Sequence, residues 1–150
     1  MSGDFLDSNV ILYLLDDGPK ADQAEAVLSR GGVISVQVLN EVLVNCLRKA
    51  GMRLDEAGAF LAGIRRLCRV VDLTVETHDV GRAVAARYGL SIYDAMIVGA
   101  ALVAGCDRLL SEDMQDGLVV EGVLTVVNPF RLGSVYPQSA TSGGCTPVSS

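Results

Sequence analysis

The sequence predicts an α/β fold, a three-layer sandwich in which a central, mostly parallel sheet of about five short strands is flanked by helices. Three observations support this prediction. Strand-like and helix-like segments alternate along most of the 150 residues, which is typical of a parallel sheet covered by helices. Half of the residues are hydrophobic, enough for one core and too many for a disordered chain. Glycine or proline stands at the ends of most helix-like segments, where these residues stop or start helices.

The individual elements are predicted from short apolar runs and from the glycine and proline residues at their ends. The expected strands are residues 4–6, 33–34, 70–73, 108–111 and 124–127. The expected helices are residues 10–15, 19–30, 36–50, 54–68, 77–88 and 91–104. Pro19 suits the first turn of its helix, and Gly31, Gly51, Gly89 and Gly105 suit helix ends. In a sheet of this kind, ligands bind at the carboxyl ends of the strands.

Two of the expected helices are apolar on every side. Residues 10–15 are six apolar residues in a row, and after Asp94 no polar side chain occurs until Asp107. A helix without a polar face is buried. We therefore expect both helices in the interior of the molecule.

The chain is expected to be one domain with a tail. Residues 1–132 contain every predicted element, whereas residues 133–150 carry no charge and include twelve Gly, Pro, Ser or Thr residues. Such a composition cannot form a packed core. We expect residues 133–150 to be a flexible tail outside the domain.

Charge is unevenly distributed along the chain. The formal net charge is −6. Residues 48–87 nevertheless hold eight basic and five acidic side chains, whereas the rest of the chain holds four basic and thirteen acidic side chains. The acidic total argues against indiscriminate coating of DNA or of anionic lipid. The basic middle is either a contact surface for a polyanion or the solvated faces of amphipathic helices.

The cysteines and the apolar runs bear on the compartment. Cys46, Cys68, Cys106 and Cys145 are widely spaced, without a C-x-x-C pair or a nearby histidine, so a zinc site or a redox pair is not expected. No signal-like segment occurs at residues 1–9, and the longest apolar run, residues 95–106, is shorter than the ~20 residues of a membrane helix. We expect a cytoplasmic protein with reduced thiols and no membrane contact.

Two acids follow predicted strands. Asp7 follows the strand at residues 4–6, and Asp113 follows the strand at residues 108–111. In a parallel sheet these carboxyl ends meet at one edge, so the two side chains are expected to converge. Asp7 can instead cap the next helix, and Asp113 can be an ordinary loop acid beside the Asp116-Gly117 turn.

Two further acids lie on predicted helices. Asp94 stands in the first turn of an apolar helix, where the positive helix end favours an ionised carboxylate, although Ser91 and Asp94 also have the spacing of a capping box. Glu41 lies on a polar stripe with Gln37, Asn45 and Arg48. This stripe is either the solvated face of its helix or a surface that faces the sheet edge.

Carboxylates that converge in a partly buried pocket repel one another, and a divalent cation removes this repulsion. Oxygen ligands suit Mg²⁺ or Mn²⁺, and Mg²⁺ usually keeps waters and substrate phosphate oxygens in its shell. The chemistry that fits such a site is metal-assisted hydrolysis of a phosphodiester.

Four segments in this order resemble the PIN-domain family, and within it the VapC-like ribonuclease toxins of toxin–antitoxin pairs. The matching segments are Phe5-Leu6-Asp7-Ser8-Asn9-Val10-Ile11, Asn40-Glu41, Tyr93-Asp94-Ala95-Met96-Ile97 and Leu109-Leu110-Ser111-Glu112-Asp113-Met114. The resemblance extends over residues 4–130 and implies a Mg²⁺-dependent endoribonuclease that leaves a 5′-phosphate. It also implies a homodimer that is silenced by a cognate antitoxin.

The resemblance assigns roles to individual residues. Asp7 and Asp94 are expected to be the principal metal ligands, and Glu41 and Asp113 are expected to complete the acidic cluster. Asn9 is expected to steady Asp7, and Ser111, where many relatives have threonine, is expected to hydrogen-bond within the cluster. Contacts to RNA phosphates are expected from the basic middle of the chain, first from Arg48 and Lys49.

Two other functions remain open at this stage. One is a catalytically silent domain of the same fold that binds RNA or a partner protein. The other is a Mg²⁺-dependent phosphatase that forms an aspartyl-phosphate, but such enzymes usually have a second acid two residues after the nucleophile, and here Asn9 stands in that position.

Overall fold

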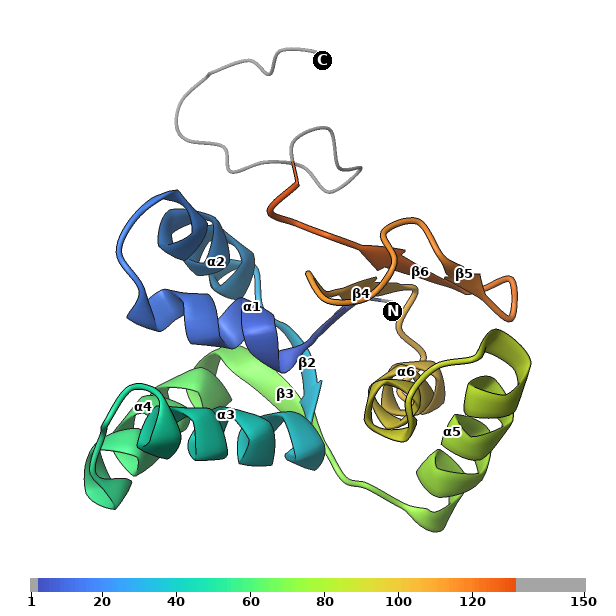
Figure 1. Ribbon diagram of the computed structural model, residues 1–150, viewed down its shortest axis with the longest axis horizontal. Coiled ribbons are helices and arrows are strands. Elements are labelled where there is room, and N and C mark those ends of the chain that lie inside the picture. The colour runs from blue at the N-terminus through green and yellow to red at the C-terminus, as the bar shows by residue number, and fades with distance from the viewer. Residues whose placement is uncertain (1–2, 132–150) are drawn as a thin grey trace.

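The computed structural model describes residues 3–131 and shows a sheet between two groups of helices (Figure 1). Within these residues the sheet has six strands in the order β3-β2-β1-β4-β6-β5. All neighbouring strands are parallel except β5 and β6, which are antiparallel. The strands are β1 (Asp4–Leu6), β2 (Gly32–Ser35), β3 (Cys68–Val71), β4 (Arg108–Leu110), β5 (Val119–Val120) and β6 (Leu124–Val127).

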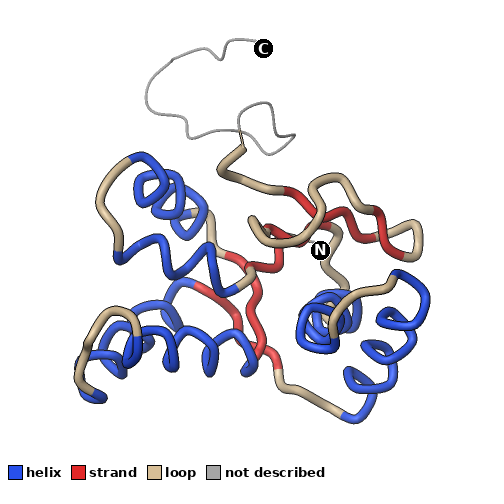
Figure 2. The backbone as a smooth tube through the Cα atoms, in the orientation of Figure 1, coloured by secondary structure: helices blue, strands red, loops and turns tan. Residues whose placement is uncertain are grey.

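The helices cover both faces of the sheet. Helices α5 and α6 form an antiparallel pair on one face, and the first four helices lie on the other (Figures 1 and 2). The strands form a continuous band between these groups in Figure 2. The bounds are α1 (Ser8–Leu12), a 3₁₀-helix (Tyr13–Leu15), α2 (Pro19–Ser29), α3 (Val36–Arg48), α4 (Leu54–Leu67), α5 (Val75–Tyr88) and α6 (Ile92–Val103).

The pairing of β1 with β4 positions the candidate site. In this register Phe5 lies opposite Leu109 and Leu6 lies opposite Leu110, and all four side chains are fully buried. The residues after these strands therefore emerge side by side at the carboxyl edge of the sheet. The backbone N–H of Asp7 donates to the carbonyl of Leu110 over 3.0 Å, which fixes this edge.

The helix pair α5–α6 approaches closely because glycines stand at the contact. A Cβ added to Gly99 of α6 would lie 3.0 Å from the backbone nitrogen of Gly81 and 3.1 Å from the carbonyl oxygen of Thr77, both in α5. Backbone therefore packs against backbone at this point. The contact matters for the site because α6 carries Asp94 near its first turn.

The prediction of an α/β sandwich with a mostly parallel sheet is confirmed, with corrections to individual elements. The described sheet has a sixth strand, β5, which is only two residues long and therefore has no periodicity for a sequence to display. The helix expected at residues 10–15 is α1 followed by the 3₁₀-helix, and only Val10 and Ile11 of that run are buried, so it is not an interior helix. The third strand begins at Cys68 rather than at residue 70.

The predicted tail at residues 133–150 lies outside the described residues, and residue 132 does too. No helix within residues 3–131 is both long and apolar enough to cross a bilayer.

Candidate active site

Asp7 is the most buried acid at the carboxyl edge of the sheet, with 5% of its surface exposed. It is the N-cap of α1: Oδ1 accepts from the backbone N–H of Ser8 over 2.7 Å. Oδ2 accepts from the Ser111 hydroxyl over 2.8 Å and from the amide of Asn9 over 3.3 Å. The Asp7 side chain therefore both caps α1 and contacts the segment that follows β4.

Burial raises the pKa of Asp7 to about 6, against the opposing effect of its hydrogen bonds from Ser111 and Ser8. The negative charges of Glu41 and Asp94 add to this increase. A raised pKa caused by burial together with neighbouring carboxylates is typical of functional sites.

Asn9 joins Asp7 to the segment that carries Asp113. Its amide nitrogen donates to Oδ2 of Asp113 over 3.1 Å, and its carbonyl oxygen accepts from the backbone N–H of Glu112 over 3.1 Å. Ser111 makes the second connection, because its hydroxyl oxygen also accepts from the backbone N–H of Asp113 over 3.2 Å. The structure thus brings together Asp7, Asn9, Ser111 and Asp113.

Glu41 approaches the cluster from α3, and its orientation is set by Gln37 one turn earlier. The Gln37 amide donates to Oε2 of Glu41 over 2.9 Å and to the carbonyl oxygen of Tyr93 over 3.2 Å. Gln37, Glu41 and Asn45 are all half-buried. The Gln37–Glu41 end of the polar stripe therefore faces the start of α6, whereas Arg48 at its other end is exposed.

Asp94 completes the set from the first turn of α6. The Ser91 hydroxyl caps this helix by accepting from the Asp94 N–H over 3.2 Å. Partial burial raises the pKa of Asp94, the hydrogen bond with Ser91 opposes this, and the charges of Asp113 and Glu41 raise it further. Capping thus accounts for Ser91, while Asp94 also shares the electrostatic environment of the other acids.

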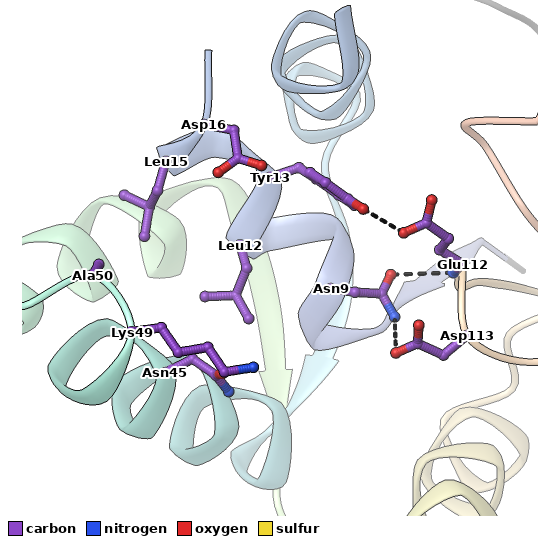
Figure 3. A pocket seen from close by; sticks show the side chains of 10 residues that line it. All are labelled: Asn9, Leu12, Tyr13, Leu15, Asp16, Asn45, Lys49, Ala50, Glu112 and Asp113. Atoms are coloured by element: carbon purple, nitrogen blue, oxygen red, sulfur yellow. Dashed lines mark hydrogen bonds between the residues drawn. The ribbon is translucent and has the colours of Figure 1, made fainter. Parts of the chain in front are cut away.

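A pocket of about 500 Å³ adjoins the acids (Figure 3). Asn9 and Asp113 form the wall that it shares with the acidic cluster, and Asn45 and Lys49 of α3 and the following turn line the opposite side. Leu12 and Leu15, two of the apolar residues expected to be interior, line it as well. The pocket therefore combines an acidic rim, a lysine and apolar side chains.

The donor set fits a hydrated Mg²⁺ ion better than an ion enclosed by protein. Within residues 3–131 no three carboxyl, thiol or imidazole side chains lie close enough together to hold a metal ion by themselves. Mg²⁺ is usually held by one or two carboxylates and keeps several waters. Asp7 and Asp94, whose pKa values are raised in part by the neighbouring acids, are suited to hold such an ion.

Two predicted residues, Arg48 and Lys49, and the turn residue Asp116 lie apart from the acids or at the margin of the site. Lys49 lines the pocket, whereas Arg48 is exposed and is not among the lining residues. Asp116 accepts from the backbone N–H of Asn128 over 2.8 Å and from Arg131 over 3.2 Å, so it anchors the end of the described chain.

Sequence reasoning assigned no role to four residues that support this region. Gln37 was predictable from its position one turn before Glu41 on the polar stripe. Tyr13, Lys20 and Glu112 form a hydrogen-bonded group beside Asp113. No sequence pattern identifies this group, because its members come from segments that meet only in the folded chain.

The family model of the PIN domain matches residues 5–115. The chain belongs to the PIN-domain family. The matched range contains Asp7, Glu41, Asp94 and Asp113, so all four converging acids lie within the PIN domain.

Solved structures share the fold of this PIN domain at low sequence identity. A toxin–antitoxin complex from Klebsiella pneumoniae has a TM-score of 0.65 at 18% identity, over 85% of this chain and 98% of that chain. DNA-bound VapBC from Salmonella typhimurium has a TM-score of 0.63 at 20% identity, over 84% and 98%. VapC20 from Mycobacterium tuberculosis, a sarcin–ricin loop cleaving toxin, has a TM-score of 0.60 at 20% identity, over 73% and 89%. No curated protein matches the sequence significantly.

Proposed function

We propose that this PIN domain is a Mg²⁺-dependent endoribonuclease, with Mn²⁺ as a substitute, that hydrolyses RNA phosphodiester bonds and leaves a 5′-phosphate. The observation that carries the proposal is the convergence of Asp7, Glu41, Asp94 and Asp113 from four separate segments at the carboxyl edge of the sheet. Burial raises the pKa of Asp7 and of Asp94, and the charges of the neighbouring acids raise both further; a bound dication would favour the ionised form of these carboxylates.

Asp7 and Asp94 are assigned as the ligands of the ion, and Glu41 and Asp113 as the acids that complete its environment. Ser111, Ser8 and Asn9 hold Asp7 in one orientation through three hydrogen bonds. Gln37 does the same for Glu41. A bound Mg²⁺ would supply an activated water and neutralise the charge that develops on the phosphate. The protein contributes preorganised carboxylates that need no rearrangement when the substrate arrives.

The pocket beside Asp113 is assigned to the RNA. Lys49 on its far side provides a positive charge for a phosphate, and Leu12 and Leu15 provide an apolar surface. The outward position of Arg48 makes it a secondary contact. RNA rather than DNA is proposed because one neighbour of the same fold is a sarcin–ricin loop cleaving toxin.

We further propose that the protein is the toxin of a toxin–antitoxin pair, acts in the cytoplasm and forms a homodimer. Structures of the same fold include toxin–antitoxin assemblies from Klebsiella pneumoniae and Salmonella typhimurium. Ile92 and Tyr93, the two residues before Asp94, are 56% and 75% exposed. An apolar surface that a partner protein would bury therefore adjoins the acids.

The decisive experiment replaces Asp94 with asparagine, which keeps the shape of the side chain and removes its charge. We expect Asp94→Asn to fold normally and to lose at least ~100-fold of the Mg²⁺-dependent cleavage of RNA, in line with the loss of one preorganised electrostatic group. Asp79→Asn, the same change on the exposed surface of α5, is the matched control and is expected to cleave at the parent rate. Cleavage by Asp94→Asn at the parent rate contradicts the assignment.

The same assay separates the enzyme from a silent binding module. Parent protein that binds RNA tightly but cleaves none with Mg²⁺ or Mn²⁺ would show that the domain binds without cutting. Cleavage that requires either ion and stops with EDTA supports the nuclease.

A further inference from the structure

Asp113 lies in an irregular segment, residues 111–116, that follows β4 and belongs to no helix or strand. Asp113 is exposed, whereas Asp7 is fixed by its place in a helix cap. An acid that takes part in catalysis must be held in a productive position to be effective. The contacts that hold this segment therefore determine where the Asp113 carboxylate lies.

The side chain of Glu112 attaches the segment to the N-terminal helices. The Tyr13 hydroxyl donates to Oε1 of Glu112 over 2.5 Å, and Lys20 Nζ lies 2.5 Å from Oε2. Lys20 also donates to the Tyr13 hydroxyl oxygen over 3.2 Å, so each of the three side chains is hydrogen-bonded to the other two. Tyr13 points across the pocket rim towards Glu112 in Figure 3. We call Tyr13, Lys20 and Glu112 the latch.

The latch is reinforced by Phe130. The rings of Tyr13 and Phe130 meet edge to face with 4.8 Å between their centroids, and Lys20 Nζ lies 4.9 Å from the Tyr13 centroid and 6.0 Å from that of Phe130. Asp116, at the other end of the segment, accepts a hydrogen bond from the backbone N–H of Asn128. The segment around Asp113 is therefore attached on both sides.

We propose that Tyr13, Lys20 and Glu112 are positioning residues for Asp113, an inference that rests on the proposed nuclease function. They act through Asn9: with the Glu112 side chain held, the Glu112 N–H donates to Asn9 Oδ1, and the Asn9 amide nitrogen then faces Asp113 and Asp7. Without the latch, Glu112 loses its side-chain attachment to Tyr13 and Lys20, and the hydrogen bond from its N–H that orients the Asn9 amide is weakened.

A second group in this chain provides a matched control. Arg87 pairs with Glu121 over 3.2 Å, the Tyr88 hydroxyl donates to the same carboxylate over 3.1 Å, and Arg87 lies 5.7 Å from the Tyr88 ring centroid. This group has the same chemistry as the latch but joins the end of α5 to the turn between β5 and β6. Exposed ion pairs contribute little to stability, so a general loss of ion pairing affects both groups alike.

The experiment compares Lys20→Met and Tyr13→Phe with Arg87→Met and Tyr88→Phe. We expect each latch variant to lower kcat roughly tenfold or more, because misplacing a reacting group affects the chemical step. KM should stay nearly unchanged in Lys20→Met, because Lys20 does not line the pocket assigned to the RNA. We expect the control variants to cleave at the parent rate. Lys20→Arg, which keeps the charge and the donor, should restore most of the activity.

Amide hydrogen exchange gives a readout that is independent of cleavage. Lys20→Met should speed exchange in residues 111–116 by about tenfold or more and leave the strands unchanged, because it opens this segment locally. Arg87→Met should leave residues 111–116 as they are. If the parent protein cleaves no RNA, the exchange result still tests whether the latch holds the segment, so failure of the nuclease is distinguishable from failure of the latch.

Three results would overturn the proposal: unchanged exchange in residues 111–116 of Lys20→Met, an equal change in Arg87→Met, or full activity of both latch variants in an active parent. An increase in KM at constant kcat would also contradict it, because that result assigns the latch to RNA binding rather than to the position of Asp113.

Discussion

At the scale of single residues, Asp7 shows a conflict between stability and the proposed function. A buried carboxylate beside other acids is costly to ionise, as its pKa of about 6 indicates. The folded protein retains the Asp7 proton at a pH where the unfolded chain, with an ordinary pKa, has lost it. Stability is therefore greatest below the unfolded pKa, near 3.8, and decreases as the pH rises towards 6.

This argument predicts the effect of Asp7→Asn on folding. The Asp7 contribution should lower the parent's free energy of unfolding by roughly 2–3 kcal/mol between pH 4 and pH 6. Asp7→Asn, which cannot ionise, should remove this decrease in the free energy of unfolding, while losing Mg²⁺-dependent cleavage. Urea unfolding of both proteins across this pH range without divalent ions measures it. Asp79→Asn should show the same dependence of the free energy of unfolding on pH as the parent. If Asp7→Asn also showed the parent's dependence on pH, the prediction would be wrong.

The sequence was sufficient to predict that Asp7 and Asp113 lie at one edge of the sheet, because this depends on backbone topology. Asp7 and Asp113 follow parallel strands, and the carboxyl ends of such strands always share an edge. The sequence did not reveal whether the polar face of α3 that carries Glu41 contacts solvent or the rest of the protein. The helical spacing of polar residues is the same in both cases. The orientation became clear only from the contact of Gln37 with the Tyr93 carbonyl.

At the scale of elements, the packing of α5 on α6 determines where Asp94 lies. The backbone contact at Gly99 leaves no room for a Cβ, because the nearest atoms belong to the backbone of Gly81 and Thr77 and cannot turn away as a side chain can. Any larger residue at this position forces the two helices apart.

Gly99→Ala should therefore destabilise the fold by about 1–3 kcal/mol, a typical cost of overpacking, even though alanine favours the helix itself. The matched control is Gly58→Ala on the exposed side of α4, where no atom lies within 4 Å of the added Cβ. This control should gain about 0.5–1 kcal/mol from helix propensity alone. Urea unfolding of both variants measures the difference, and a gain in stability for Gly99→Ala would show that the helices are not in close backbone contact.

Elements were predictable where the chain marks their ends and less so elsewhere. Gly89 ends α5 in a left-handed conformation, as its place after the helix-like segment at residues 77–88 predicts. The start of α5 was placed two residues late, because the cap is Thr74, whose hydroxyl accepts from the N–H of Thr77. The run at residues 10–15 was assigned to the interior because apolar content does not reveal that Leu12 and Leu15 line a pocket.

At the scale of the whole molecule, the net charge of −6 and the position of the acids have opposite consequences for RNA. The negative net charge of the protein repels a polyanion, so RNA binding requires positive charge at the site itself. Lys49 supplies part of it, and a dication held by Asp7 and Asp94 would supply more. The ion is then expected to influence the stability of the whole fold and not only the chemistry.

Addition of Mg²⁺ should accordingly stabilise the protein against unfolding at pH 7. An ion that binds only the folded state at ten times its Kd contributes about 1.4 kcal/mol, and the attraction between the ion and the ionised carboxylates of Asp7 and Asp94 is the physical source of that binding. Asp7→Asn and Asp94→Asn should lose this stabilisation, whereas Asp79→Asn should retain it and EDTA should reverse it. Thermal unfolding with MgCl₂ against KCl of equal ionic strength separates site binding from general screening, because screening acts on all variants alike. An equal increase in Tm for the parent and for both site variants would mean that Mg²⁺ acts on the surface charge of the molecule and does not bind between these acids.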